Sequence, residues 1–103
     1  MNNSVHWMPL TARSHYLSTP LCHGDLLEFV REPTNQFDQN AIRVTLRGQP
    51  TQQVGYVPRN YAALIAPQID SGDFDINLVV ARCPHSDDFH IQIVFCVDNN
   101  YRV

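Results

Sequence analysis

The sequence contains no lysine, so its seven basic residues are all arginine, and ten acidic residues outnumber them. The formal net charge of −3 excludes a protein that coats DNA without specificity, because such proteins carry a strong positive field. It does not exclude a small local site. The planar guanidinium of arginine fits phosphate and stacks on rings, so a few well-placed arginines can hold a short stretch of nucleic acid.

Long apolar runs are also missing. No stretch approaches the roughly 20 residues of a membrane span, and the first residues lack the basic and apolar segments of a signal peptide. We therefore expect a soluble, cytoplasmic protein without a membrane partner. Its three cysteines, Cys22, Cys83 and Cys96, are odd in number and widely spaced. They predict reduced thiols that pack as small apolar groups.

Known catalytic and metal-binding motifs are absent from the sequence as well. The cysteines and the five histidines lack the paired spacings of a zinc site. Convergence of Cys83, His85, His90 and Cys96 from neighbouring strands is conceivable, but it is not favoured. There is no Gly-x-Ser-x-Gly elbow, and the four glycines lie too far apart for a phosphate-binding loop. The sequence thus predicts a binding protein with no metal, no cofactor and no catalytic residue.

Strand patterns fill most of the chain. Alternating or continuous apolar residues predict strands over 5–10 (running on toward Tyr16), 26–31, 41–47, 53–57, 74–83 and 89–97. In three of them one face is expected to be apolar: Ile42, Val44 and Leu46; Phe74, Ile76, Leu78 and Val80; and Phe89, Ile91, Ile93, Phe95 and Val97. About six strands in a chain of this size suggest a small closed or partly open barrel, with a two-layer α+β sandwich as the alternative.

One helical segment interrupts the strands. Pro58 suits the first turn of a helix, since its missing N–H is no loss there, and Gly72 is a natural stop. Four apolar residues recur at helical spacing on one face: Tyr61, Leu64, Ile65 and Ile69. Pro67 lies within this run and predicts a kink or a split into two short pieces.

The polar loop between the second and third predicted strands carries the main functional signal. Asn35, Asp38 and Asn40 can each hydrogen-bond nearby backbone and hold a fixed turn. One interpretation is structural: a rigid polar loop with Phe37 tucked under it as an anchor. The other is functional, because an aromatic side chain on a rigid loop is a stacking platform for an unpaired base. The neighbouring carboxylate repels phosphate, so it fits a strand that ends in a free hydroxyl.

Three motifs in this order resemble the HIRAN domain family, from about Pro9 to Val97. They are Arg-Glu-Pro-x-Asn-x-Phe-Asp-x-Asn-Ala-Ile-x-Val at 31–44, Val-Gly-Tyr-Val-Pro-Arg at 54–59 and Ala-Pro-x-Ile-Asp-x-Gly at 66–72. The family is best known at the N-terminal end of SWI/SNF-type DNA translocases and ubiquitin ligases that act at stalled forks. It also occurs as a stand-alone bacterial protein, which this chain resembles. The resemblance implies a mainly β fold: an OB-like or SH3-like barrel of about six strands with a short two-piece helical insertion.

The resemblance also implies a ligand, because the fork-remodelling member captures the 3′-hydroxyl end of single-stranded DNA. Carried over by motif, Phe37 would be the stacking aromatic residue and Asp38 the acceptor for the terminal hydroxyl. Asn35 would fix the loop and contact the end nucleotide. Tyr56 and Arg59 would line the pocket and meet phosphate.

Two further aromatic residues complete the implied site. His15, after Ser14, stands where the end-binding member has the tyrosine of an Arg-Tyr pair, and it would stack. Phe89 would supply a second ring. The sequence departs from the family pattern at two other positions: Phe37 replaces a tyrosine, and Gln36 replaces a proline.

Two functions are carried forward. The leading hypothesis is a single HIRAN-like domain over residues 1–103, with its core at about 9–97, that binds single-stranded DNA at a 3′ end. A helicase or nuclease supplied in trans would then carry the enzymatic activity. The alternative is a protein–protein interaction module without DNA affinity, an accessory to a DNA repair or processing enzyme that docks on an edge strand. Convergence of exposed Phe37, Asp38, Tyr56 and Arg59 side chains on a concave surface would favour DNA, and burial of Phe37 would favour the alternative.

Overall fold

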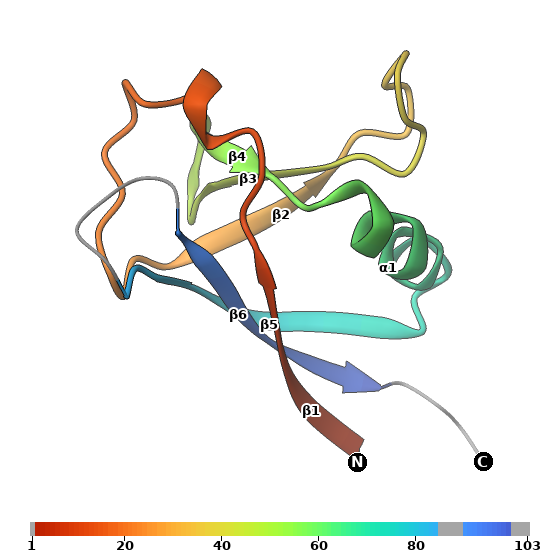
Figure 1. The fold of residues 1–103 in the computed structure, drawn as a ribbon. Helices are drawn as coiled ribbons and strands as arrows, with labels where there is room; N and C mark the ends of the chain where they lie inside the picture. The colour runs from red at the N-terminus through yellow and green to blue at the C-terminus, as the bar shows by residue number, and fades with distance from the viewer. Residues whose placement is uncertain (1, 85–89, 100–103) are drawn as a thin grey trace.

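The computed structural model of the chain describes residues 2–84 and 90–99. In these ranges six strands form two three-stranded antiparallel sheets (Figure 1). One sheet contains, in spatial order, β1 (Asn2–Pro9), β6 (Gln92–Asn99) and β5 (Phe74–Arg82). The other contains β2 (Leu27–Arg31), β3 (Ile42–Leu46) and β4 (Gln49–Tyr56). The predicted mainly β fold is confirmed.

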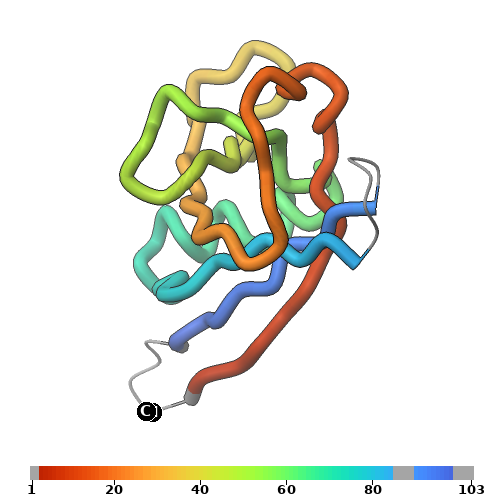
Figure 2. The backbone as a smooth tube through the Cα atoms, turned by 90° about the vertical axis from the view of Figure 1, so that its left-hand side faces the viewer, coloured from red at the N-terminus to blue at the C-terminus, as the bar shows by residue number. Residues whose placement is uncertain are grey.

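Two isolated backbone bridges join the edges of these sheets. Thr11, just after β1, exchanges two hydrogen bonds with Tyr56 at the end of β4: each N–H donates to the other residue's carbonyl oxygen at 2.9 Å. Leu26, just before β2, bridges to Val80 in β5. The strand order therefore closes on itself as β1-β6-β5-β2-β3-β4, a small barrel. Figure 2 shows β1 and β6 side by side along one flank of it.

The core lies between the two sheets. Its inward-facing residues on and just before β6 are all 5% exposed or less: Ile91, Ile93, Phe95 and Val97. This confirms the predicted apolar face for these four positions, while Phe89 lies outside the described residues. Fully buried side chains from the other strands meet them: Met8, Ile42, Val44 and Val54.

Two strands deviate from simple alternation because of irregular pairing. In β5 the register shifts between Ile76 and Leu78. Beyond the shift Val79 and Ala81 are buried, while Leu78 is exposed, so the predicted continuous apolar face is wrong there. In β3 the register with β4 shifts on both sides of Thr45, which is buried although alternation predicts it on the outer face.

The largest differences between predicted and observed strand boundaries are at the end of β1 and the start of β4. β1 ends at Pro9 and does not run on toward Tyr16, because Thr11 turns to pair with β4 and a short 3₁₀ helix, η1 (Arg13–His15), follows. β4 begins earlier than predicted, at Gln49. It includes Pro50, which an edge strand tolerates because one side of its backbone needs no ladder partner.

The helix α1 (Arg59–Ser71) is one continuous element of 13 residues at one end of the barrel (Figure 1). The predicted split into two pieces is wrong. Pro67 removes a single N–H donor from the helix. Ala62 and Ala66, which precede Pro67, are buried and pack the helix against the core, so it continues through the proline. Gly72, with φ of 80°, ends the helix, and its N–H donates to the Ile69 carbonyl at 3.1 Å.

The buried face of α1 is also shifted from the predicted one. It is formed by residues that recur at i, i+3, i+4 and i+7: Ala62, Ile65, Ala66 and Ile69. Tyr61 and Leu64 are exposed instead. The small alanines allow a close approach to the sheet, and an assignment based on the large apolar residues alone overlooks them.

The three cysteines are free thiols. Cys83 packs against the core and Cys96 is half-buried, as expected of small apolar groups. Cys22 is exposed, so the prediction of packing is wrong for it. The reason is local: its N–H donates to the Asp25 carboxylate at 2.8 Å in a surface turn. Among the described residues, no helix has the length and apolar character needed to cross a membrane.

Gly55 permits the close approach of β1 and β4. A Cβ atom at this position would lie 2.5 Å from the Thr11 carbonyl oxygen and 2.8 Å from a methyl carbon of Leu10. We expect Gly55→Ala to lower the free energy of unfolding, measured by urea titration, by about 1–3 kcal/mol, because an added methyl group overpacks this contact. It should also raise amide hydrogen exchange at Thr11 and Tyr56. Gly48→Ala is the control for backbone strain without a clash, because nothing lies within 4 Å but the φ of 72° disfavours a side chain. It should leave these two amides protected. Unchanged exchange in Gly55→Ala would contradict the steric role.

Candidate functional site

The loop between β2 and β3 is held by its own side chains. The Asn35 Oδ1 atom accepts hydrogen bonds from the N–H groups of Phe37 (2.8 Å) and Asp38 (3.0 Å). Asp38 Oδ1 accepts one from the Asn40 N–H at 2.9 Å. The predicted turn-fixing roles of Asn35 and Asp38 are confirmed. Asn40 takes part through its backbone.

Arg31 ties both ends of this loop to the helix α1. Its Nε and Nη2 atoms donate to the two carboxylate oxygens of Asp70 at 2.9 and 2.8 Å. Its Nη1 and Nη2 atoms also donate to the carbonyl oxygens of Ala41 (2.7 Å) and Gln39 (3.0 Å). The hydrogen bonds from Arg31 lower the pKa of the Asp70 carboxyl. One guanidinium thus joins the first and third sequence motifs.

Phe37 projects from this fixed loop into solvent. Its side chain is 85% exposed, so the interpretation of Phe37 as a tucked-under anchor is wrong. Its backbone is nevertheless held on both sides, because its N–H donates to Asn35 and its carbonyl oxygen accepts a 2.6 Å hydrogen bond from Arg59 Nη2. The ring is therefore presented by a rigid backbone.

A hollow of about 300 Å³ lies beside this ring. We call it the Phe37 hollow. Five of the seven predicted site residues line it: Asn35, Phe37, Asp38, Tyr56 and Arg59. The remaining walls are Thr11, Ala41 and Val57. Within it, Asp38 Oδ2 lies 3.5 Å from Arg59 Nε, so an anionic acceptor and a cationic donor stand next to each other at its edge.

Tyr56 forms the wall opposite the loop and is positioned by the barrel itself. Its backbone closes the bridge to Thr11, whose Oγ1 also donates to the Tyr56 carbonyl at 2.9 Å. Its hydroxyl donates to Glu32 Oε1 at 2.9 Å, and Asn35 Nδ2 donates to the same oxygen at 3.0 Å. Burial, together with the hydrogen bond to Glu32, raises the pKa of Tyr56.

Sequence reasoning missed Glu32, although it stands in the Arg-Glu-Pro motif at the start of the loop. Its carboxylate joins the loop to β4, and this contact spans 24 positions in the sequence. Its place in the motif was a signal for its importance. Its partner Tyr56 could not be identified without the fold.

Of the two other predicted residues, His15 is described by the structure and does not reach the Phe37 hollow. His15 is exposed and does not line it. His15 connects to it only through Tyr16, whose ring centroid lies 6.4 Å from that of His15 and 6.3 Å from that of Tyr56. Phe89 lies outside the described residues. Tyr16 is thus a second residue that sequence reasoning missed, and the signal was its place directly after His15.

Buried Arg13 fixes this aromatic segment. Its Nη1 atom donates to the Tyr16 carbonyl and its Nη2 atom to the Thr19 carbonyl, both at 2.8 Å. Over residues 2–84 and 90–99, no three His, Cys, Asp or Glu side chains are grouped so that they could hold a metal ion. His85, part of the conceivable zinc arrangement, lies outside these ranges.

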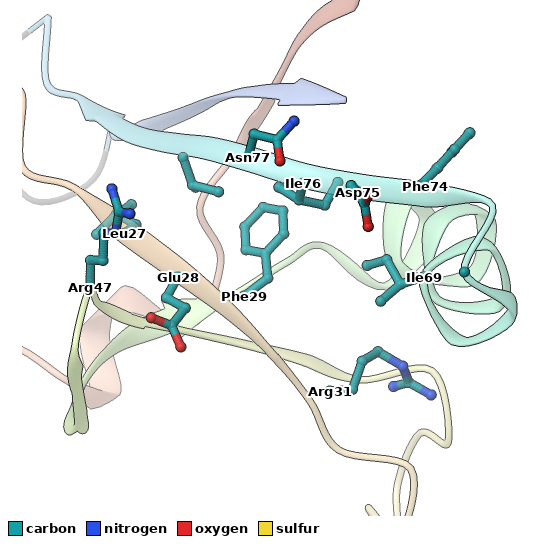
Figure 3. A pocket seen from close by; sticks show the side chains of 12 residues that line it. Leu27, Glu28, Phe29, Arg31, Arg47, Ile69, Phe74, Asp75, Ile76 and Asn77 are labelled. Atoms are coloured by element: carbon teal, nitrogen blue, oxygen red, sulfur yellow. The ribbon is translucent and has the colours of Figure 1, made fainter. Parts of the chain in front are cut away.

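A second hollow, of about 420 Å³, opens where β2 and β5 diverge beyond the Leu26–Val80 bridge (Figure 3). Phe29 from β2 and Ile76 from β5 point into it. Glu28 and Asp75 line it together with Arg31 and Arg47, so its walls carry charges of both signs. None of the predicted site residues contributes to this hollow.

Comparisons with known proteins give a family and a fold. The sequence profile of the HIRAN domain family matches residues 8–98. A solved structure, the HIRAN domain of human HLTF, superposes with a TM-score of 0.68 at 21% sequence identity. The match covers 91% of this chain and 74% of that one. It supports the OB-like barrel described above.

Two curated proteins are similar to the chain in sequence. A SWI/SNF-related matrix-associated actin-dependent regulator of chromatin subfamily A member 3-like 1 protein from Arabidopsis thaliana is 43% identical over 56 residues, which is 54% of this chain and 6% of that protein. A Fanconi-associated nuclease 1 homolog from Oryza sativa subsp. japonica is 28% identical over 85 residues, 82% of this chain and 9% of that protein. The chain therefore spans less than a tenth of either relative.

The double role of Asn35 as acceptor and donor can be tested directly. Asn35→Asp keeps the acceptor for two backbone N–H groups, but it replaces the amide that faces Glu32 with a second carboxylate. We expect the free energy of unfolding at neutral pH to fall by about 1–3 kcal/mol and to recover as acid protonates the pair. The control Gln36→Glu adds the same charge to the same loop on an exposed side chain and should change stability by less than about 0.5 kcal/mol. A loss that does not vary with pH would argue against carboxylate repulsion.

Proposed function

The chain belongs to the HIRAN domain family, and on that basis we propose that it is a nucleic-acid-binding module that holds single-stranded DNA at a 3′-hydroxyl end. The observation that carries the proposal is the exposure of Phe37, an 85% exposed ring on a backbone fixed from both sides. Exposing a phenyl ring to water is unfavourable for a folded chain alone. A base that stacks on it removes that unfavourable exposure.

The ring and the size of the Phe37 hollow suit a single nucleoside. Stacking holds a base by its face without reading its identity, so the ring accounts for affinity and not for sequence preference. The volume of about 300 Å³ lies at the lower end for ligand pockets. It therefore suits one terminal unit better than a longer stretch of chain.

Asp38 supports the preference for an end. One of its oxygens holds the loop and the other faces Arg59 at 3.5 Å, so the carboxylate is fixed at the edge of the hollow. A sugar hydroxyl can donate to such a carboxylate, whereas a phosphate at the same position is repelled. We infer that Asp38 selects a free hydroxyl, and that Arg59, whose side chain is 73% exposed, offsets the charge of the neighbouring phosphate.

The enzymatic activity belongs to a different polypeptide segment in this proposal. The curated relatives are named as a chromatin regulator and a nuclease homolog, and the chain matches only a small part of each. We propose that a helicase or nuclease acts with this module, either in trans or as the rest of a longer chain. The outer face of the β1-β6-β5 sheet, where Val5, Trp7 and Leu78 are exposed, supports such a protein contact. It also supports the alternative function, a protein-interaction module without DNA affinity.

The role of Asp38 can be measured by fluorescence anisotropy with short single-stranded DNA labelled at its 5′ end. Wild type should prefer a 3′-hydroxyl to a 3′-phosphate by roughly tenfold or more, as hydrogen bonds to charged groups imply. Asp38→Asn retains an oxygen for the loop but removes the charge, and it should reduce this preference to about twofold or less. Asp73→Asn, on an exposed turn, makes the same charge change and should keep the preference. Equal binding of both ends by wild type would leave no role for Asp38 in end selection.

The contribution of stacking is separable from that of the charge. Phe37→Ala should weaken DNA binding by roughly 5- to 150-fold, which corresponds to the 1–3 kcal/mol of one stacked base. The melting temperature should stay nearly constant because the ring is exposed. Leu64→Ala removes another exposed apolar side chain, 70% exposed on α1, and should leave the affinity unchanged. If Phe37→Ala binds DNA like wild type, DNA does not contact the ring and the stacking role is wrong; only absence of DNA binding by wild type would favour the protein-interaction alternative.

A further inference from the structure

Arg43 is a cation next to the proposed site, and its Nε atom has no hydrogen-bond partner among the described residues. It lies on β3, the central strand of its sheet, directly opposite Tyr56 on β4. None of the described residues accepts a hydrogen bond from its Nε atom, although that atom is buried. The nearest carboxylate oxygen, Glu32 Oε2, is 3.8 Å away, which is beyond hydrogen-bond distance.

The situation of Arg43 differs from that of the other two arginines around the loop. Arg31 uses its guanidinium on Asp70 and two carbonyl oxygens. Arg59 donates to the Phe37 carbonyl and lies beside Asp38. Buried polar groups are normally paired, and an unpaired one points to a partner from outside the chain, such as an ion or a ligand. Of these three, Arg43 is the one with a buried Nε atom from which no described residue accepts a hydrogen bond.

Glu32 holds Arg43 without saturating it. The Oε1 atom of Glu32 is occupied by the Tyr56 hydroxyl and the Asn35 amide. Its Oε2 atom attracts the guanidinium across 3.8 Å. This attraction restricts the position of the Arg43 side chain, which remains 31% exposed. An external anion can therefore reach a guanidinium that is already oriented.

Arg43 lines a shallow hollow that adjoins the Phe37 hollow. This Arg43 hollow has a volume of about 480 Å³, and three of its residues are shared with the Phe37 hollow: Asn35, Phe37 and Tyr56. Its other walls include Glu32, Pro33 and Thr34. A strand whose last base stacks on Phe37 would pass from one hollow into the other. The two hollows together have the layout of two successive nucleotide subsites.

We propose that the Arg43 guanidinium binds the phosphate that links the last two nucleotides of the bound strand. The inference rests on the proposed function. Arginine and phosphate form charge-assisted hydrogen bonds, often two in parallel. The exposed part of the Arg43 side chain would make this contact, because its Nε atom is buried. The contact also explains how an acidic chain can bind a polyanion: one arginine neutralises the charge of one phosphate, and no broad positive surface is needed.

The test uses the anisotropy assay with strands in which a single phosphate linkage is replaced by a neutral methylphosphonate. Replacement at the last linkage should weaken binding to wild type by about tenfold or more, the size expected for a hydrogen bond to a charged group. Arg43→Gln should weaken binding of the natural strand by a similar factor. It should also lower the slope of log affinity against log salt by about 0.7, the value for one phosphate of a single strand. The two changes together should cost no more than either alone.

Two controls separate this contact from general electrostatics. Arg47→Gln removes the same charge from an exposed position at the end of the same strand and should leave the penalty of the methylphosphonate intact. Arg43→Lys keeps the charge but loses the planar fork, so its affinity should fall between those of wild type and Arg43→Gln. Preference for the 3′-hydroxyl should persist in all three variants because Asp38 is unchanged.

The outcomes separate the Arg43 contact with phosphate from the proposed binding of a 3′ end. If wild type binds DNA but the last linkage tolerates methylphosphonate without loss, the Arg43 contact is overturned and end binding stands. The same holds if the losses from Arg43→Gln and the modified linkage simply multiply. The comparison of linkages in wild type alone can overturn the contact but cannot assign it to Arg43, because Arg59 also lies near the strand end. If Arg43→Gln folds poorly, Arg43→Lys is the second variant for the comparison with the modified linkage. Absence of any DNA binding by wild type overturns both the proposed function and the inference.

Discussion

The structure of the site depends on the guanidinium of Arg31. This group contacts the end of the loop through Gln39 and Ala41, and it contacts the end of α1 through Asp70. A loop with this many polar residues has many conformations of similar energy, and a single rigid fork with several acceptors selects one of them. The hydrogen bonds of Asn35 and Asp38 then fix the tip of a loop whose ends no longer move. These contacts join residues 31–44 and 66–72, which are distant in sequence and which carry two of the three motifs.

A second constraint connects the site to the closure of the barrel. Tyr56 pairs with Thr11 through its backbone, and its side chain forms a wall of the Phe37 hollow. The same side chain is joined to the loop through Glu32. Separation of the sheets at this edge would therefore displace the wall and the loop together. Gly55 precedes Tyr56 because no larger residue fits against Thr11 at this edge.

Sequence patterns predicted the strands well, because alternation is a local property of each segment. They failed at the two irregular pairings, beside Leu78 in β5 and Thr45 in β3, because a register shift depends on the partner strand. They also misjudged α1. The local effect of Pro67 on a helix is real, but the packing of small alanines against the sheet outweighs the loss of one hydrogen bond.

The candidate site shows the same division between local and distant contacts. The turn-fixing roles of Asn35 and Asp38 depend on contacts within the loop and could therefore be predicted from its sequence. Whether Phe37 points inward or outward could not, since both conformations use the same residues, and the contact that distinguishes them comes from Arg59, 22 positions away. Arg43 was not identified from the sequence for a similar reason. The strand pattern predicts an ordinary outward-facing residue, and its unpaired Nε atom near Glu32 is recognised only in the fold.

The fixed backbone under an exposed ring has a kinetic meaning. Where a loop must order itself around its ligand, association is slower than collision, and part of the interaction energy is lost to ordering. Here the loop is ordered before any ligand arrives, so an encounter with a suitably oriented base needs no rearrangement. A shallow hollow with one ring and few direct contacts also releases its ligand quickly. Under the proposed function, the module would therefore sample many strand ends in succession and hold each for a short residence time. Lasting retention would depend on the enzyme that acts with it.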